Sequence, residues 1–250
     1  MDKINPLEIV FPRRTSGYFE DFDHLEANRF TATVTGTGAA TIDADDPDGA
    51  VTITSGATQN SDVVFAETNA NAYLANGKPC EWEARFKHTE GNTDDGAVAF
   101  GCTSQAAALT DLFVDSTGAF HANSFSGAMI IKPVNSTRWV MISSIGTTQV
   151  STTLDVTHVS GQMMNWGLLV QPLSATEVQF IPYCDPTGVG ALKPVMEYSA
   201  NRAARTTQVV HRRTWSSGIA MRGLFSVKNP LGGVAEVCSL DYFARRKRRS

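Results

Sequence analysis

The feature of this sequence that most constrains its fold is the alternation of apolar and polar side chains in residues 81–87, EWEARFK. Trp82, Ala84 and Phe86 fall on one side, and the charged residues fall on the other. A period of two residues indicates a β-strand, because a helix would scatter the same side chains around its axis. Further segments with strand character are residues 96–103, 139–145, 150–156, 165–171, 176–183 and 223–229. The sequence therefore predicts a chain built mainly of strands.

Turn-forming residues separate these segments, as in NGKP (76–79), NTDDG (92–96), DPTG (185–188) and NPLGG (229–233). Strands at short spacing, without long helical patterns between them, are typical of a sandwich or barrel. The chain has 250 residues, 42% of them hydrophobic and 18% charged, which fits one large folded all-β domain. Trp82, Trp139 and Trp166 lie in apolar segments, so we expect them in the core.

Charge is distributed unevenly along the chain. Residues 1–100 hold 17 acidic and 7 basic residues, whereas residues 201–250 hold 2 acidic and 11 basic ones. Five consecutive cations, residues 245–249, follow a strand-like segment near the end. Such asymmetry favours contact with an oppositely charged surface, such as the acidic region of a neighbouring copy. The alternative, left open by the sequence, is that folding brings the two ends together and mixes their charges.

The sequence shows no targeting or membrane-spanning segment. The first residues, MDKINPLEIVFPRR, lack the apolar core of a signal peptide, and no apolar run approaches the length of about 18 residues that a spanning helix needs. None of the four cysteines lies in a CxxC pattern, so we expect buried, reduced thiols in a protein made in the cytoplasm. We predict an N-terminal arm (residues 1–27), one β-sandwich domain (28–244) and a short basic C-terminal tail (245–250).

Three stretches resemble a known family. They are EDFDHLEANRFTATVTGTGAATID with the DDPDGAVTITSGAT that follows it, CEWEARFKHTEGNTDDGAVAFGCTS, and GIAMRGLFSVKNPLGGVAEVCSLDYFARRKR. In this order they resemble the concanavalin A-like jelly-roll domains of tailed-phage virion structural proteins, over most of residues 20–245. The resemblance implies a sandwich of two curved antiparallel sheets. Phage members of the family are typically head decoration or cement proteins, or parts of fibres and tails, but the fold also contains lectins and glycosidases.

The resemblance implies a non-enzymatic virion protein that decorates and cements the capsid. Its expected partners are the major capsid protein and its own copies, as a dimer or trimer, with no membrane contact. Nucleic acid is disfavoured, because the chain without its five terminal cations carries a formal charge of -9. The alternative is a carbohydrate-binding module of a fibre or tail, for which Trp215 is the candidate sugar contact. The predicted partner-binding residues are Arg202, Arg205, Arg212, Arg213, Arg245, Arg246, Lys247, Arg248 and Arg249.

The residues give little support to catalysis. Glycosidases need two carboxylates flanking one sugar bond, and laminarinase-type members of this fold carry them on one strand as ExDxxE. Here Glu81 and Glu83 share a strand face, the central aspartate is missing, and Phe86 stands where the second glutamate would be. We expect a solvated face on which these two acids pair with Arg85 and Lys87. The sequence therefore predicts no catalytic residues.

Metal and cofactor signals are equally weak. The acidic segment DADDPDG (43–49) departs from the calcium-loop order, with Thr54 where a bidentate glutamate belongs, and is predicted to be a solvated turn. The five histidines (24, 88, 121, 158 and 211) show no HxH or HExxH spacing, so no zinc site is predicted. No cofactor is predicted either.

Overall fold

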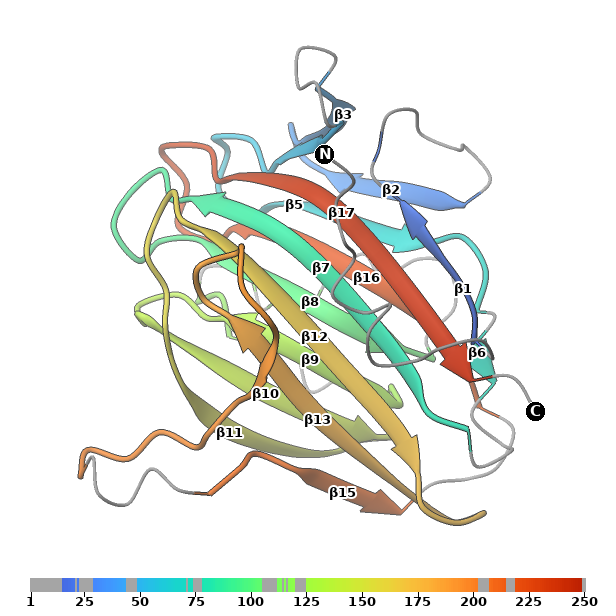
Figure 1. Cartoon of the computed structure of the whole chain (residues 1–250). Helices are drawn as coiled ribbons and strands as arrows, with labels where there is room; N and C mark the ends of the chain where they lie inside the picture. The colour runs from blue at the N-terminus through green and yellow to red at the C-terminus, as the bar shows by residue number, and fades with distance from the viewer. Residues whose placement is uncertain are drawn as a thin grey trace.

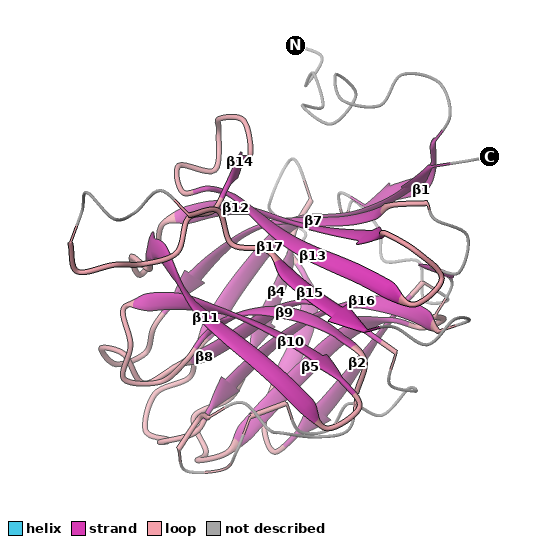
Figure 2. Cartoon of the chain, turned by 90° about the horizontal axis from the view of Figure 1, so that it is seen from below, coloured by secondary structure: helices cyan, strands magenta, loops and turns pink. Residues whose placement is uncertain are grey.

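The computed structural model contains two β-sheets packed face to face, with no helix in the part of the chain that it describes (Figures 1 and 2). The structure describes residues 15–20, 22, 29–43, 49–70, 72–73, 78–104, 112–113, 115, 117–119, 125–201, 207–214 and 219–248. Every strand pair between these residues is antiparallel. The predicted antiparallel sandwich is therefore confirmed. All seven strands predicted from alternation are present, as β7, β8, β10, β11, β12, β13 and β16.

The first sheet, called sheet A here, lies in front in Figure 1 and has the order β14-β13-β12-β7-β17-β4-β3. Strand β1 also pairs with β17, and β15 also pairs with β13. The strands of sheet A are β1 (Thr15–Glu20), β3 (Ala39–Ile42), β4 (Val51–Thr54), β7 (Cys80–Thr89), β12 (Met163–Pro172), β13 (Glu177–Asp185), β14 (Lys193–Pro194), β15 (His211–Thr214) and β17 (Val237–Arg248).

The second sheet, sheet B, lies behind sheet A and has the order β11-β10-β9-β8-β16-β5-β2, with β6 also paired to β16. Its strands are β2 (Phe30–Thr35), β5 (Ser61–Glu67), β6 (Ala72–Tyr73), β8 (Ala97–Thr103), β9 (Gly127–Lys132), β10 (Arg138–Ile145), β11 (Thr148–Thr157) and β16 (Ala220–Asn229). The chain thus crosses between the two layers. Strand β7 in sheet A, for example, is followed by β8 in sheet B, and the neighbours of β7 within sheet A are β12 and β17.

The core between the sheets is built from the apolar face of the alternation. Trp82, Trp139 and Trp166 are all fully buried, as predicted, and belong to one hydrophobic cluster with residues from both sheets. The four cysteines are also buried and carry free thiols. Because burial of apolar area is the main driving force for folding, this layer fixes which face of each strand turns inward.

The outer face of sheet B is covered over its middle strands as well, by a second apolar cluster that includes Phe113, Phe125 and Val134. Strands β8 and β9 are therefore buried at every position, since they are covered on both faces. A strand buried on both sides has no polar alternation to display. Of these two strands, β8 was predicted from the sequence and β9 was not.

The two predicted terminal segments are partly strands. Residues 15–20 of the predicted arm form β1, which lies beside β17, while residues 1–14 and 23–28 lie outside the described residues (Figure 1). Strand β17 does not stop at residue 244 but runs to Arg248, pairing with β7 on one edge and β1 on the other. Residues 245–248 of the predicted tail (245–250) therefore belong to β17, with the backbone of residues 245–247 paired on both sides and that of Arg248 paired with β1.

The arginine-rich segment before residue 217 is also part of the sandwich. Its residues 211–214 form β15, an edge strand paired with β13. In the described ranges, no helix is long and apolar enough to span a membrane.

Candidate functional site

The two acidic residues of β7 point away from the core, as the alternation requires, but they do not form a solvated face. Glu83 is only 1% exposed. Its Oε1 accepts hydrogen bonds from the Tyr242 hydroxyl and, at 2.9 Å, from the Asn165 side-chain amide. Burial raises the pKa of Glu83, and these two hydrogen bonds lower it in part. The prediction that Glu83 pairs with Arg85 or Lys87 was wrong, because its partners come from β17 and β12.

The second acidic residue of β7, Glu81, lies two residues earlier on the same face. Burial raises its pKa to about 7, the charge of Glu83 adds to the rise, and Arg246 opposes it. Arg246 stands directly opposite Glu81 in the β7–β17 register. Arg85, the next outward residue, forms an ion pair with Asp241 at 3.0 Å. Glycoside hydrolysis needs two carboxylates that reach one substrate, and Glu83 is enclosed by its neighbours.

Arg245, predicted to contact a partner, points into the sandwich instead. Its guanidinium forms an ion pair with Oε1 of Glu67 at 2.7 Å, with side-chain exposures of 16% and 4%. The other oxygen of Glu67 accepts hydrogen bonds from the Trp82 indole and the Gly223 amide. Arg245 also lies over the ring of Tyr18, 5.2 Å from its centroid. Arg245 is therefore part of a buried polar cluster that joins β17 to sheet B.

The other residues that were predicted to contact a partner or a sugar differ in how far the structure describes them. Arg212 is exposed on the edge strand β15. Arg213 is half-buried and donates a hydrogen bond to the Thr148 carbonyl at 2.5 Å. The residues that lie outside the described part of the chain are Arg202, Arg205, Trp215 and Arg249, and for Lys247 and Arg248 only the backbone, in β17, is described.

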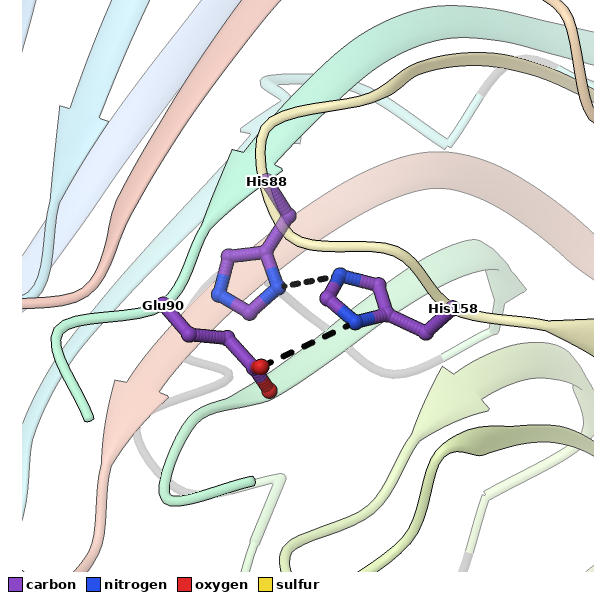
Figure 3. Close-up of side chains that lie close together, drawn as sticks. All are labelled: His88, Glu90 and His158. Atoms are coloured by element: carbon purple, nitrogen blue, oxygen red, sulfur yellow. Dashed lines mark hydrogen bonds and ion pairs between the residues drawn. The ribbon is translucent and has the colours of Figure 1, made fainter. Parts of the chain in front are cut away.

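A second polar cluster lies at one end of the core, between the sheets, and Figure 3 shows three of its side chains. His88, on the inward face of β7, has Nδ1 3.1 Å from Nε2 of His158, which directly follows β11. Nε2 of His88 lies 3.1 Å from Oε2 of Glu236. Nδ1 of His158 lies 3.9 Å from Oε2 of Glu90, which directly follows β7. His88, His158 and Glu236 are all buried, and Glu90 is half-buried.

The burial of this cluster shifts its titrations. Desolvation lowers the pKa of His88 to about 3 and that of His158 to about 4, so both imidazoles are neutral at pH 7. Desolvation raises the pKa of Glu236 to about 7, against the backbone hydrogen bond from Gly91. A neutral imidazole has one ring nitrogen without a proton, and the lone pair of this nitrogen can bind a metal ion.

A buried lysine completes the cluster. Lys132 on β9 is fully buried and forms an ion pair with Oε1 of Glu90, while it donates a hydrogen bond to the Gly96 carbonyl at 3.2 Å. Gly96 leaves room for the cluster, because a Cβ on it would lie 2.2 Å from Oε2 of Glu236. The positive φ in this turn belongs to Asp94, at 62°.

This cluster was not predicted from the sequence. His88 and Glu90 are two apart and continue the inward face of Trp82 and Phe86, which is the local signal that was available. His158 is 70 residues further along the chain, and only the packing of the sheets places it beside His88. Of the acidic segment 43–49, only Asp43 and Gly49 are described, so the predicted turn there stays a prediction.

Comparison with known proteins shows the fold. No protein-family model and no curated protein matches the chain. Among solved structures, a protein of unknown function from Shewanella oneidensis MR-1 matches with 13% identity and a TM-score of 0.57, covering 100% of this chain and 95% of its own. Peanut lectin matches with 10% identity and a TM-score of 0.59 (94% and 98%). An endo-1,3-beta-glucanase from Streptomyces sioyaensis matches with 12% identity and a TM-score of 0.59 (96% and 99%). The chain therefore has the concanavalin A-like jelly-roll fold, as the sequence resemblance implied.

Proposed function

We propose that this concanavalin A-like domain is a non-enzymatic structural protein of a phage particle. In this role it decorates the outside of the capsid and binds the major capsid protein and neighbouring copies of itself. The observation that carries the non-enzymatic part is the enclosure of Glu83 by Tyr242 and Asn165, which leaves β7 without two accessible carboxylates. The fold alone hosts both binding proteins and enzymes, so the site has to decide. The phage assignment rests on the sequence resemblance described above.

The edge of sheet B offers a surface for such binding. Strand β2, FTATVT, stands at the end of the sheet order, contains no charged residue and pairs only with β5 in the described part of the chain. Val34 on this strand is 43% exposed. An uncharged edge strand is a template for pairing with another chain, because its outer N–H and C=O groups remain available. Arg245 no longer belongs to the predicted electrostatic contact, since Glu67 neutralises it internally.

The experiment adds the purified chain to phage particles that lack it and measures the bound fraction by sedimentation. A Val34→Lys variant places a charge on the β2 edge, and Val189→Lys, at a loop position that is 83% exposed, is the matched control. We expect wild type and the control to sediment with the particles, and Val34→Lys to bind at least about tenfold more weakly. Failure of the wild-type chain to bind capsids would refute the proposed function, and equal binding of all three proteins would refute the role of the β2 edge.

A second candidate function is carbohydrate binding on a fibre or tail, which the peanut lectin match favours. A glycan array probed with the full chain, with and without calcium, tests it. Saturable binding to one glycan class, together with no binding to capsids, would favour this candidate over the first. A silent array in both conditions would exclude it.

A further inference from the structure

The cluster at the end of the core contains two facing polar atoms, Nδ1 of His158 and Oε2 of Glu90, that no hydrogen bond joins. If Glu236 is ionised, His88 donates from Nε2 to it, and Nδ1 of His88 accepts the Nε2 proton of His158. Nδ1 of His158 then has a lone pair that faces Oε2 of Glu90, 3.9 Å away. If Glu236 is protonated the donors reverse, but 3.9 Å is still too long for a hydrogen bond to Glu90. Whether Glu236 is ionised or protonated, Nδ1 of His158 and Oε2 of Glu90 therefore form no hydrogen bond with each other.

We propose that His88, Glu90 and His158 bind one divalent metal ion of the zinc type, with Glu236 as the outer carboxylate that orients His88. Each of the three residues offers one ligand atom, and these atoms lie within 4.8 Å of one another. Around a tetrahedral zinc ion with bonds of about 2.0–2.1 Å, ligand atoms lie roughly 3.3 Å apart. The ligand atoms that lie farthest apart therefore need to close by about 1.5 Å to reach bonding geometry.

The donor set favours zinc over the hard cations. Imidazole nitrogen with one carboxylate suits zinc and its transition-metal neighbours, whereas calcium and magnesium take oxygen ligands. The contact from Nε2 of His88 to Glu236 is the carboxylate–histidine arrangement that fixes the tautomer and ring orientation of metal-binding histidines. With Nε2 of His88 so engaged, its Nδ1, which faces His158 in Figure 3, is the nitrogen left for the metal, and metal binding replaces its hydrogen bond with Nε2 of His158.

The charge of the cluster also suits a cation. Lys132 holds Oε1 of Glu90, which leaves Oε2 directed at His158. The cluster contains two carboxyl groups, Glu90 and Glu236, against the single ammonium of Lys132, and Oδ1 of Asp94 lies 3.6 Å from the lysine nitrogen. A divalent ion would therefore neutralise a site that is acidic and largely withdrawn from water.

The test measures zinc binding by the full, untagged chain after a chelator has stripped it of metal. Competition with a chromophoric chelator gives the affinity, elemental analysis after gel filtration gives the stoichiometry, and the melting temperature gives the linked stabilisation. We expect one zinc ion per chain, with a higher melting temperature in zinc and no shift in calcium or magnesium. Cobalt should give the visible absorption of a four-coordinate site.

The variants separate this site from binding elsewhere. Glu90→Gln and His158→Gln should each weaken zinc binding at least about tenfold, and Glu236→Gln should weaken it roughly 10- to 100-fold through the outer contact. His211→Gln is the matched control, because His211 is also buried but bonds only Ser143 and Thr152. It should bind zinc like the wild type. Near-ultraviolet circular dichroism of each variant confirms that it is folded.

Two outcomes would overturn the proposal. One is a folded wild-type chain that binds no zinc at micromolar concentration. The other is binding that Glu90→Gln and His158→Gln leave unchanged, which would place the metal elsewhere. X-ray absorption on the zinc-loaded wild type decides the matter if these variants do not fold, since the proposal requires two imidazole ligands and no sulfur.

Discussion

The internal ion pair of Arg245 gives the sharpest test of this structure, because the sequence alone placed the same residue in a basic tail that contacts a partner. Replacing Arg245 by methionine keeps most of the side-chain volume but removes the cation that faces Glu67. Glu67 has a side-chain exposure of 4%, so its charge would then be buried with only the Trp82 and Gly223 donors. Breaking a buried pair in this way costs about 3–5 kcal/mol, and the 16% exposure of Arg245 places the expected loss near about 3 kcal/mol.

Urea unfolding followed by the fluorescence of the buried tryptophans measures this loss. For a chain of this size, about 3 kcal/mol corresponds to a fall in melting temperature of roughly 6–12 °C. The double variant Arg245→Met with Glu67→Gln should recover about 1–2 kcal/mol relative to Arg245→Met, because it removes the buried charge. Arg212→Met, on an exposed edge position, is the control and should stay within about 0.5 kcal/mol of wild type. An Arg245→Met variant as stable as this control would refute the internal pair.

Three further predictions concern single sites. Burial, with a smaller contribution from the charge of Arg213, lowers the pKa of His211 to about 4. Its contribution to stability is therefore present above pH 6.5 and is lost as the pH falls from 6.5 to about 4. Urea titrations should show His211→Gln losing less stability over this window, by up to about 1.4 kcal/mol per pH unit. Glu83→Gln should leave the free energy of unfolding within about 1 kcal/mol of wild type, because Glu83 Oε2 and Asn165 Oδ1 are buried acceptors without partners and an amide adds a donor. A loss of several kcal/mol in this variant would show that the carboxylate charge itself is needed. Gly101→Ala should destabilise the fold by about 1–3 kcal/mol or more, because its Cβ would meet the Ala128 carbonyl at 2.2 Å. An unchanged urea midpoint would contradict that contact.

The strands that are exposed on one face could be predicted from the sequence itself. The alternation in EWEARFK predicted β7 and the inward direction of Trp82 and Phe86, because the period of a strand is local and can be read over a few residues. Alternation disappears in β8 and β9, where both faces are covered, and of these two strands only β8 was predicted. The sequence-based prediction also ended β17 too early, because the run of cations hides a ladder that continues to Arg248.

The charge pairing was decided by the tertiary structure alone. The sequence showed an acidic first hundred residues and a basic end but left open whether they meet within one chain or between copies. The pairing of β17 with β7 and β1 places Arg245 beside Glu67, 178 residues away, within the same chain. The same sheet packing joins His88 to His158 across 70 residues. Such contacts depend on strand order and register, which are set by the packing of the whole core and not by any local pattern.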